Sequence, residues 1–380
     1  MRRLELDSLR GIAALIVLAY HALAINILIF SQGSQNQEID PLWGRIISYT
    51  PLRIFWSGGE AVWIFFVLSG YVLAIAAKST SFSWGSYFPS RLVRLYIPVV
   101  FAILLTFLSI KFFPHVLTDL NRDFLGNAAV DYSLSSVVND FIVITGPTNT
   151  LGPLWSLRWE ILFSLLLPVY LYVVSSRKNF WLVISLVCLL LGFWINNEFL
   201  MYMPMFYIGV WLSTFDFQMV SEMLKSRFKT PVLINVFGVF SLFVSVTLIT
   251  SFWVWGNLYS NNPLLGLPAA VFFAIVKISG IGLLLVTVML TPGLKSVLSH
   301  RWLVFFGTIS FSLYLVHWPI VVTSAFLLGP GRVSAVVGFI FSLVFAIVFY
   351  FGIEARAHKY SRKISASIKN NARKLNQFPI

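Results

Sequence analysis

The sequence holds a single cysteine and few charged residues for its length. Cys188 is the only thiol among 380 residues, so the chain can form no internal disulfide and offers no thiolate cluster for zinc. Charged residues make up 11% of the chain, whereas hydrophobic residues make up 58% and aromatic residues 17%. A soluble domain carries about 25% charged residues. The composition therefore excludes a soluble globular protein and predicts a polytopic membrane protein.

The sequence also lacks internal repeats, low-complexity tracts and any hydrophilic segment long enough to fold separately. What it has instead are about ten apolar runs of membrane length. These runs predict an all-α bundle of about ten transmembrane helices, near residues 11–30, 62–77, 95–113, 159–175, 180–195, 200–214, 235–255, 268–290, 302–327 and 334–353.

Basic residues concentrate in alternate loops, which predicts the orientation in the membrane. Loops on the cytoplasmic side carry an excess of Lys and Arg. The pattern fits a chain with both termini in the cytoplasm, in which residues 1–353 form the membrane domain and residues 354–380 a basic tail on lipid headgroups. The net charge of +13 then reflects the topology and an attraction to anionic lipid. No nucleic-acid partner is expected.

The two largest hydrophilic stretches, residues 31–61 and 114–158, fall on the opposite side and could build an outward-facing site. Glu60 lies at the outer boundary of the second span, where we expect it to be solvated. Gly70 lies within that span and predicts close helix packing, because small residues let helices approach in lipid.

Arg10 and His21 are eleven positions apart in LDSLRGIAALIVLAYHALAI, at the first apolar run. Eleven helical steps return to within about 20° of the starting direction and rise roughly 16 Å, so both side chains share one face. Arg10 would lie at the membrane surface and His21 about halfway across a hydrocarbon core of ~30 Å. A neutral imidazole there can take a proton from an alcohol. The alternatives are a His bonded between helices and an Arg that anchors the helix.

Arg91 and Arg94, in SRLVRLYIPVV, are three positions apart and predict two guanidiniums at the cytoplasmic start of the third span. They could clamp phosphates, for which Arg has a suitable fork geometry, or they could anchor the helix at the interface.

Trp155 and Trp159 mark the outer entrance to the fourth span and could stack on a sugar or form an interfacial belt. Glu160 could orient an imidazole or bind acceptor hydroxyls, unless it pairs with Arg158 or is solvated.

Lys277 and His317 fall within later apolar runs. An intramembrane Lys should face the bundle interior or a wet cavity. His317 precedes Pro319, where we expect a helix distortion, and we interpret this His as a polar contact that shapes the cavity.

Taken together, these blocks resemble acyltransferase family 3, the integral-membrane acyltransferases of extracytoplasmic glycans and some other acceptors. LDSLRGIAALIVLAYH is similar to the family's N-terminal signature, and FFVLSGY, SRLVRLYIP, LWSLRWEILF and ISFSLYLVHWPI are similar to its later blocks in the expected order. Many members have Ser-Leu-Ser-x-Glu where this chain has Ser156 to Glu160 with Arg158 in the middle. Some members append a soluble esterase-like domain, for which this chain has no room.

The resemblance implies an acyl-CoA-dependent O-acyltransferase that moves an acyl group, with acetyl expected, to an acceptor hydroxyl on the far side of a bacterial inner membrane. It implies Arg10 and His21 as the central pair and Arg91, Arg94, Glu160 and His317 as supporting residues. Its partners would be acyl-CoA, a saccharide or glycolipid acceptor and membrane lipids, without a metal.

The spacing suggests a mechanism. Arg10, Arg91 and Arg94 would hold the CoA phosphates while the pantetheine arm reaches His21, which either deprotonates the acceptor or accepts the acyl group itself. Trp155, Arg158, Trp159, His317 and Lys277 would bind the acceptor, with Glu160 assisting catalysis. A transporter that uses His21, Lys277 and Glu160 along a substrate or proton path is the alternative, and an inactive scaffold is a third reading.

Overall fold

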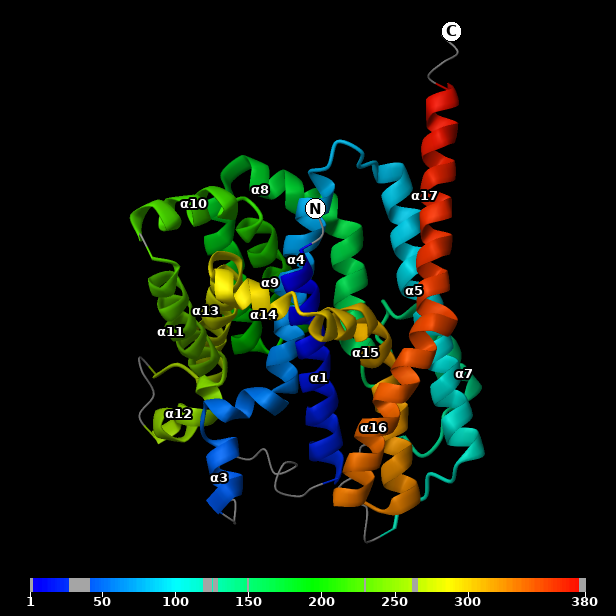
Figure 1. Ribbon diagram of the computed structural model, residues 1–380. Helices are drawn as coiled ribbons and strands as arrows, with labels where there is room; N and C mark the ends of the chain where they lie inside the picture. Colours follow the sequence, from blue (N-terminus) through cyan, green and yellow to red (C-terminus); the bar gives the residue numbers. More distant parts are fainter. Residues whose placement is uncertain are drawn as a thin grey trace. The chain divides into compact units, whose positions relative to one another are not determined.

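The computed structural model describes residues 3–26, 42–118, 125, 129–148, 150–228, 230–261 and 266–375, and each element in these ranges is a helix (Figure 1). The predicted all-α membrane fold is thus confirmed. Parts of several predicted features lie outside the described residues. They are the end of the first predicted span (27–30), residues 31–41, 119–124, 126–128 and 149 of the hydrophilic stretches, and the end of the tail (376–380).

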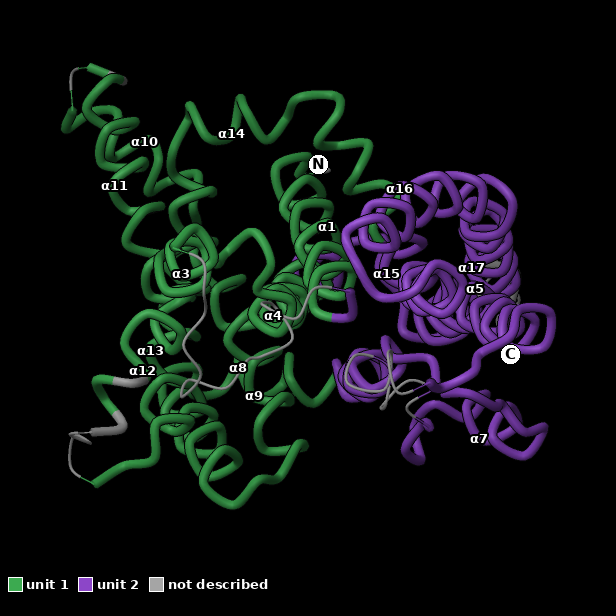
Figure 2. The backbone as a smooth tube through the Cα atoms, turned by 90° about the horizontal axis from the view of Figure 1, so that it is seen from below, with its two compact units in different colours: residues 1–24, 28–74, 168–310 green, residues 25–27, 75–167, 311–380 purple. Residues whose placement is uncertain are grey.

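The chain divides into two compact units, which are shown in different colours in Figure 2. The first comprises Met1–Ala24, Leu28–Ala74 and Pro168–Ser310, and the second comprises Ile25–Ile27, Ile75–Leu167 and Phe311–Ile380.

Unit 1 contains the N-terminal helix and the middle of the chain. Its elements are α1 (Leu4–Asn26), α3 (Leu42–Ser48), the 3₁₀ turn η1 (Pro51–Trp56), α4 (Gly58–Ala77), the second part of α8 (Leu154–Ile195), α9 (Glu198–Leu212), α10 (Phe217–Arg227), α11 (Pro231–Ile249), α12 (Ser251–Asn261), α13 (Ala269–Leu290), α14 (Pro292–Leu298) and the start of α15 (Arg301–Leu328). Within it, α13 packs against α11 and α12.

Unit 2 contains α5 (Trp84–Phe112), α7 (Leu134–Ile142), the first part of α8, the rest of α15, α16 (Arg332–Phe349), the π-helix η3 (Tyr350–Glu354) and α17 (Ala355–Leu375). The basic tail begins as part of this unit, because α17 runs beside α5. Ser361 donates a hydrogen bond to the Ser90 carbonyl at 2.8 Å.

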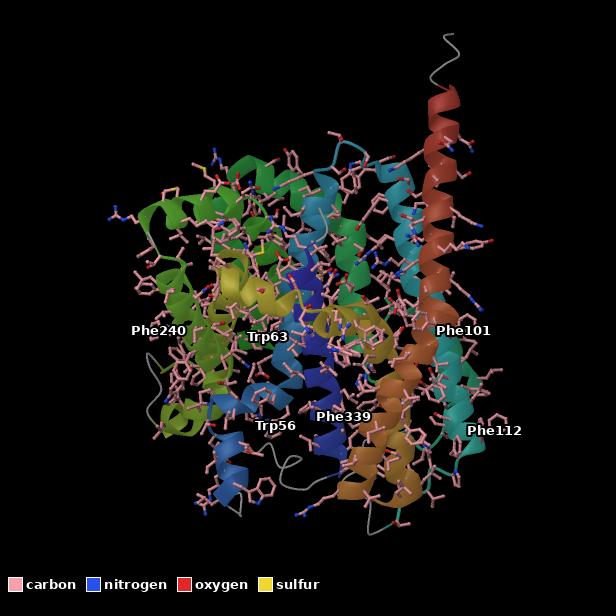
Figure 3. All side chains as sticks on the ribbon, in the orientation of Figure 1. Trp56, Trp63, Phe101, Phe112, Phe240 and Phe339 are labelled. Carbon is pink, nitrogen blue, oxygen red and sulfur yellow. The ribbon has the colours of Figure 1, made fainter. Side chains whose placement is uncertain are left out.

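The described part of each predicted apolar run is mainly helical, although the run 235–255 is divided at Thr250 between α11 and α12. In the described part of the chain, eight helices are long and apolar enough to cross a membrane, namely α1, α4, α5, α8, α11, α13, α15 and α16 with its continuation into α17. Phe112 and Phe240 point outward from their units (Figure 3) and are 76% and 64% exposed. Large exposed apolar side chains of this kind suit contact with lipid.

Two predicted runs, 159–175 and 180–195, are two helical segments that meet at a kink between them, as predicted, and together carry the single label α8. Helix α8 is 42 residues long and bends at Arg177, whose φ of −135° and ψ of 67° are not helical. The predicted run 200–214 lies in α9, which has only 15 residues. Asn197 begins α9 as an N-cap, accepting a hydrogen bond from the Leu200 N–H at 3.1 Å.

Helices α4 and α9 pack backbone to backbone, as the sequence predicted for Gly70. A Cβ atom at Gly70 would overlap the carbonyl oxygen of Phe206, and one at Gly209 would overlap that of Val67. Both positions therefore require glycine, which confirms the small-residue interpretation. This contact fixes the position of α4 against α9. Helix α4 also packs against Tyr20, the residue before His21.

Candidate functional site

Arg10 and His21 both lie in α1, which is helical without interruption from Leu4 to Asn26. The predicted spacing is therefore realised: the two residues share one face of the helix and are separated by a rise of roughly 16 Å. Both side chains are half-buried. The ring of Tyr20 meets the ring of His21 edge-on, with centroids 5.0 Å apart and planes at 66°.

The first turn of α4 lies directly against Tyr20. A Cβ atom built on Gly58 would come within 2.6 to 2.9 Å of Tyr20 Cδ1, Cγ and Cβ. The next residue, Gly59, has nothing within 4 Å of its corresponding position. The start of α4 thus limits the space that the Tyr20 ring can occupy.

A buried cation lies in the turn before α4. Arg53 of η1 is 4% exposed, and its Cζ is 3.6 Å from the ring centroids of both Trp56 and Trp253. Figure 3 labels Trp56 in this region. The surrounding protein lowers the pKa of Arg53 to about 10, mainly through burial and against the opposing effect of Glu60. Even so, Arg53 is charged at neutral pH.

Lys277 forms an ion pair with Glu60, which corrects the prediction that Glu60 is solvated. Lys277 Nζ is 3.1 Å from Glu60 Oε1, and Glu60 is 6% exposed. The Trp253 indole N–H donates to the same oxygen at 3.3 Å, and Trp63 and Phe252 place their rings 4.8 and 5.3 Å from Nζ. Glu60 is buried because its charge is paired, and Lys277 faces the interior of unit 1 as predicted.

In unit 2, the structure brings together two residues from different sequence blocks. Arg91 on α5 forms an ion pair with Glu160 on α8 through Nη2 and Oε1. Its Nε donates to Ser164 Oγ at 3.2 Å, and Ser164 in turn donates to the Glu160 carbonyl at 2.8 Å. Glu160 therefore contacts Arg91, a partner that the sequence did not suggest. This contact corrects the prediction that Arg91 lies at the cytoplasmic boundary and Glu160 at the outer one, because the two side chains meet at one depth.

Arg94 has different neighbours from Arg91. Its Nε donates to His358 Nε2 of α17 at 2.9 Å, so the two arginines of the predicted clamp contact different helices. Glu354, 3.4 Å from His358, is 3% exposed and accepts a 3.0 Å hydrogen bond from the Ser312 N–H as well as the Ser312 hydroxyl proton.

Glu354 and His358 are not among the site residues predicted from the sequence. The available signal was their i,i+4 spacing at the end of the last apolar run. The π-helix that contains Glu354 could not be read from the sequence, although such bulges often mark functional positions.

The predicted acceptor residues of unit 2 are mostly enclosed. Trp159 is 2% exposed, with Arg158 Cζ 4.7 Å from its ring centroid, whereas Trp155 is half-buried. His317 is 1% exposed and donates from Nδ1 to the Leu313 carbonyl at 3.0 Å, one turn earlier in α15. Its ring nitrogen Nε2 is therefore the atom that accepts in this tautomer.

The candidate residues thus form two groups. Arg10, His21 and Lys277 belong to unit 1, and Arg91, Arg94, Trp155, Arg158, Trp159, Glu160 and His317 belong to unit 2. Cys188 is half-buried in α8. In the residues that the structure describes, no cluster of three or more His, Cys, Asp or Glu side chains could hold a metal ion.

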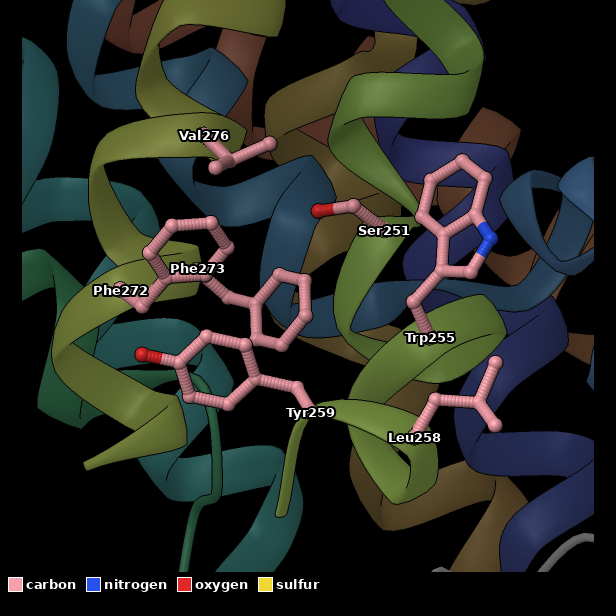
Figure 4. Close-up of a pocket in the computed structure, with 7 residues that line it drawn as sticks. All are labelled: Ser251, Trp255, Leu258, Tyr259, Phe272, Phe273 and Val276. Atoms are coloured by element: carbon pink, nitrogen blue, oxygen red, sulfur yellow. The ribbon is translucent and has the colours of Figure 1, made fainter. Parts of the chain in front are cut away.

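A separate pocket of about 430 Å³ lies between α12 and α13 in unit 1 (Figure 4). Aromatic and aliphatic side chains make up most of its wall, and it contains none of the predicted site residues. It is lined by Ser251, Trp255, Leu258, Tyr259, Phe272, Phe273 and Val276.

The apolar helices and the charged side chains inside them define an integral membrane protein. The chain belongs to acyltransferase family 3: the family model, described as an acyltransferase domain, matches residues 3–351. It is also similar to the peptidoglycan O-acetyltransferase OatA of Listeria monocytogenes, with 26% identity over 353 residues. That match covers 83% of this chain and 49% of the relative, so the chain spans about half of the relative's length. No solved structure matches the chain.

Proposed function

We propose that the protein is a membrane O-acyltransferase that moves an acyl group, with acetyl expected, from cytoplasmic acyl-CoA to a hydroxyl of an extracytoplasmic glycan. Family membership supports acyl transfer, and the similarity to a peptidoglycan O-acetyltransferase supports a glycan hydroxyl as the acceptor. The observation that carries the proposal is the single uninterrupted helix on which Arg10 and His21 share a face. The corresponding membrane would be a bacterial plasma membrane, with both termini in the cytoplasm.

In this proposal the arginines bind the donor. Arg10 is half-buried and Arg94 is exposed, so each can present a guanidinium to phosphate oxygens. Arg91 already forms an ion pair with Glu160. It could bind a phosphate only through the guanidinium N–H groups that this pair does not use. The rise of roughly 16 Å from Arg10 to His21 then matches the reach of an extended pantetheine arm.

His21 would act on the acceptor at the thioester. As a general base, its imidazole takes the hydroxyl proton while the oxygen attacks the thioester carbonyl. The C–S bond breaks, the C–O bond forms, and the CoA thiolate takes up the proton. As a nucleophile, a ring nitrogen of His21 would attack the thioester carbonyl, so that the C–S bond breaks and the CoA thiolate leaves. The acceptor oxygen would then attack the acyl carbon, the N–acyl bond would break, and the hydroxyl proton would pass to the freed imidazole and on to the thiolate.

On the acceptor side we propose Trp155, Arg158, Trp159, His317 and Lys277, with Glu160 assisting. The enclosed positions of Trp159 and His317 favour roles in shaping the wall of the site. Lys277 is paired with Glu60 inside unit 1, so it would offer the acceptor a charge that is already balanced. Residues 1–353 would form the catalytic domain, and residues from 354 onward its basic extension.

Donor binding tests the arginine assignment. We expect the Arg10→Ala variant to bind acyl-CoA at least tenfold more weakly than the wild type in detergent, while Arg332→Ala at the start of α16 binds normally. Unchanged binding by Arg10→Ala would refute the clamp. Mass spectrometry of envelope glycans from cells with and without the chain would identify acceptor and acyl group together. The absence of any acyl mass difference would contradict the proposed reaction.

A further inference from the structure

We propose that Tyr20 is a positioning residue for His21, held in place by the first turn of α4 and the Glu60–Lys277 ion pair. This inference rests on the proposed function, in which His21 acts on the acceptor or carries the acyl group. It assigns a role to Tyr20, Gly58 and Glu60, which otherwise have no part in the reaction.

Tyr20 and His21 are in direct ring contact. They are consecutive in α1, and the edge-on arrangement at 5.0 Å places the tyrosine ring beside the imidazole. A rotation of the Tyr20 ring about its first side-chain torsion would either open space for the imidazole or push it aside. The position of Tyr20 therefore limits the orientations available to His21.

Helix α4 fixes the base of the Tyr20 side chain. The position of a Cβ on Gly58 lies 2.6 to 2.9 Å from Tyr20 Cδ1, Cγ and Cβ, distances that real Cβ atoms do not adopt. Because two of these three atoms are Cβ and Cγ of Tyr20, the contact is with the stiff base of the side chain. The tyrosine cannot move toward α4, and α4 cannot move toward α1.

The start of α4 is in turn fixed by charges from three other elements. Glu60, two residues after Gly58, binds Lys277 of α13 at 3.1 Å and Trp253 of α12 at 3.3 Å. Trp253 also stacks on Arg53 of η1, the turn that leads into α4.

Such a constraint has a kinetic consequence. A base or nucleophile must be held within hydrogen-bond reach of the reacting group, and a displacement of about 1 Å can cost on the order of 100-fold in rate. Loss of the constraint should lower kcat through His21 and leave donor binding at Arg10, about three turns away on α1, unchanged.

The adjacent glycines Gly58 and Gly59 give a matched test with the purified full chain. We expect Gly58→Ala to lower kcat by about tenfold or more with an unchanged KM for acyl-CoA, because the new methyl group displaces Tyr20. Gly59→Ala, whose methyl group enters open space, should stay within about twofold of wild type. Equal kcat values for the two variants, with both proteins folded, would overturn the proposal.

Variants of Tyr20 keep the proposal testable if Gly58→Ala fails to fold. We expect Tyr20→Phe, which keeps the ring, to retain wild-type kcat, and Tyr20→Leu to lose about tenfold and to shift the pH–rate profile assigned to His21. A His21→Ala variant with full turnover would refute the proposed function itself. An inactive His21→Ala together with a fully active Tyr20→Leu would refute only the positioning role.

Discussion

Arg91 and Glu160, which are 69 positions apart in the sequence, form an ion pair between α5 and α8 with both side chains largely buried. Their side chains are 13% and 17% exposed. The pair joins the arginine block to the block that holds the proposed acceptor residues. In the proposed function, a phosphate that binds Arg91 would therefore share this guanidinium with Glu160.

Removing the carboxylate charge of Glu160 should destabilise the protein. We expect Glu160→Gln to lower the free energy of unfolding by about 1–2 kcal/mol, because Arg91 loses a charged hydrogen-bond acceptor in a largely buried setting. Glu222→Gln, on the exposed helix α10, should change it by less than about 0.5 kcal/mol. Thermal unfolding in detergent measures both, and equal stabilities for the two variants would contradict the importance of the pair.

The Glu60–Lys277 pair should show strong coupling between its partners. Lys277→Met leaves a buried carboxylate without its cation, and we expect a loss of about 3–5 kcal/mol. The double variant Glu60→Gln/Lys277→Met removes both charges and should recover much of that loss. A double-mutant cycle of unfolding midpoints measures the coupling. Additive effects of the two single changes would mean that the charges do not interact.

Close packing of α4 and α9 predicts intolerance at Gly70. We expect Gly70→Ala to destabilise the protein by several kcal/mol, because its methyl group would overlap the Phe206 carbonyl and force the helices apart. Gly282→Ala in α13, where the methyl group meets nothing within 4 Å, should be neutral or slightly stabilising. The fraction of monodisperse protein after heating reports both. A stable Gly70→Ala variant would argue against the helix contact.

His115 should contribute to acid sensitivity. It stacks on Phe326 at 4.3 Å and bonds Thr323 Oγ1 at 3.1 Å, and burial lowers its pKa below the usual 6.5. Below pH 6.5 the unfolded chain then binds more protons than the folded one, so this contribution is present above pH 6.5 and is lost as the pH falls. We expect His115→Gln to show a smaller drop in melting temperature between pH 7 and pH 5 than the wild type. Identical drops would exclude this contribution.

The sequence predicted the helices well because each apolar run is long enough to need burial in lipid, and this signal is local. It also predicted that Arg10 and His21 share a helix face, because their spacing follows helical geometry. It could not predict that Glu60 is buried, since its partner Lys277 is 217 positions away. The same limit applies to His358, whose contact with Arg94 depends on α17 lying beside α5. The break at Arg177 was predicted because basic residues interrupt the apolar pattern there, and the backbone of Arg177 is not helical.

The central claim is acyl transfer through His21, and turnover by purified protein in detergent tests it most directly. Labelled acetyl-CoA and a glycan acceptor would be supplied without a membrane gradient, so that a transporter makes no product. We expect labelled ester on the acceptor with the wild type and a loss of at least 100-fold with a folded His21→Ala variant. Transfer at the wild-type rate by His21→Ala would contradict the account.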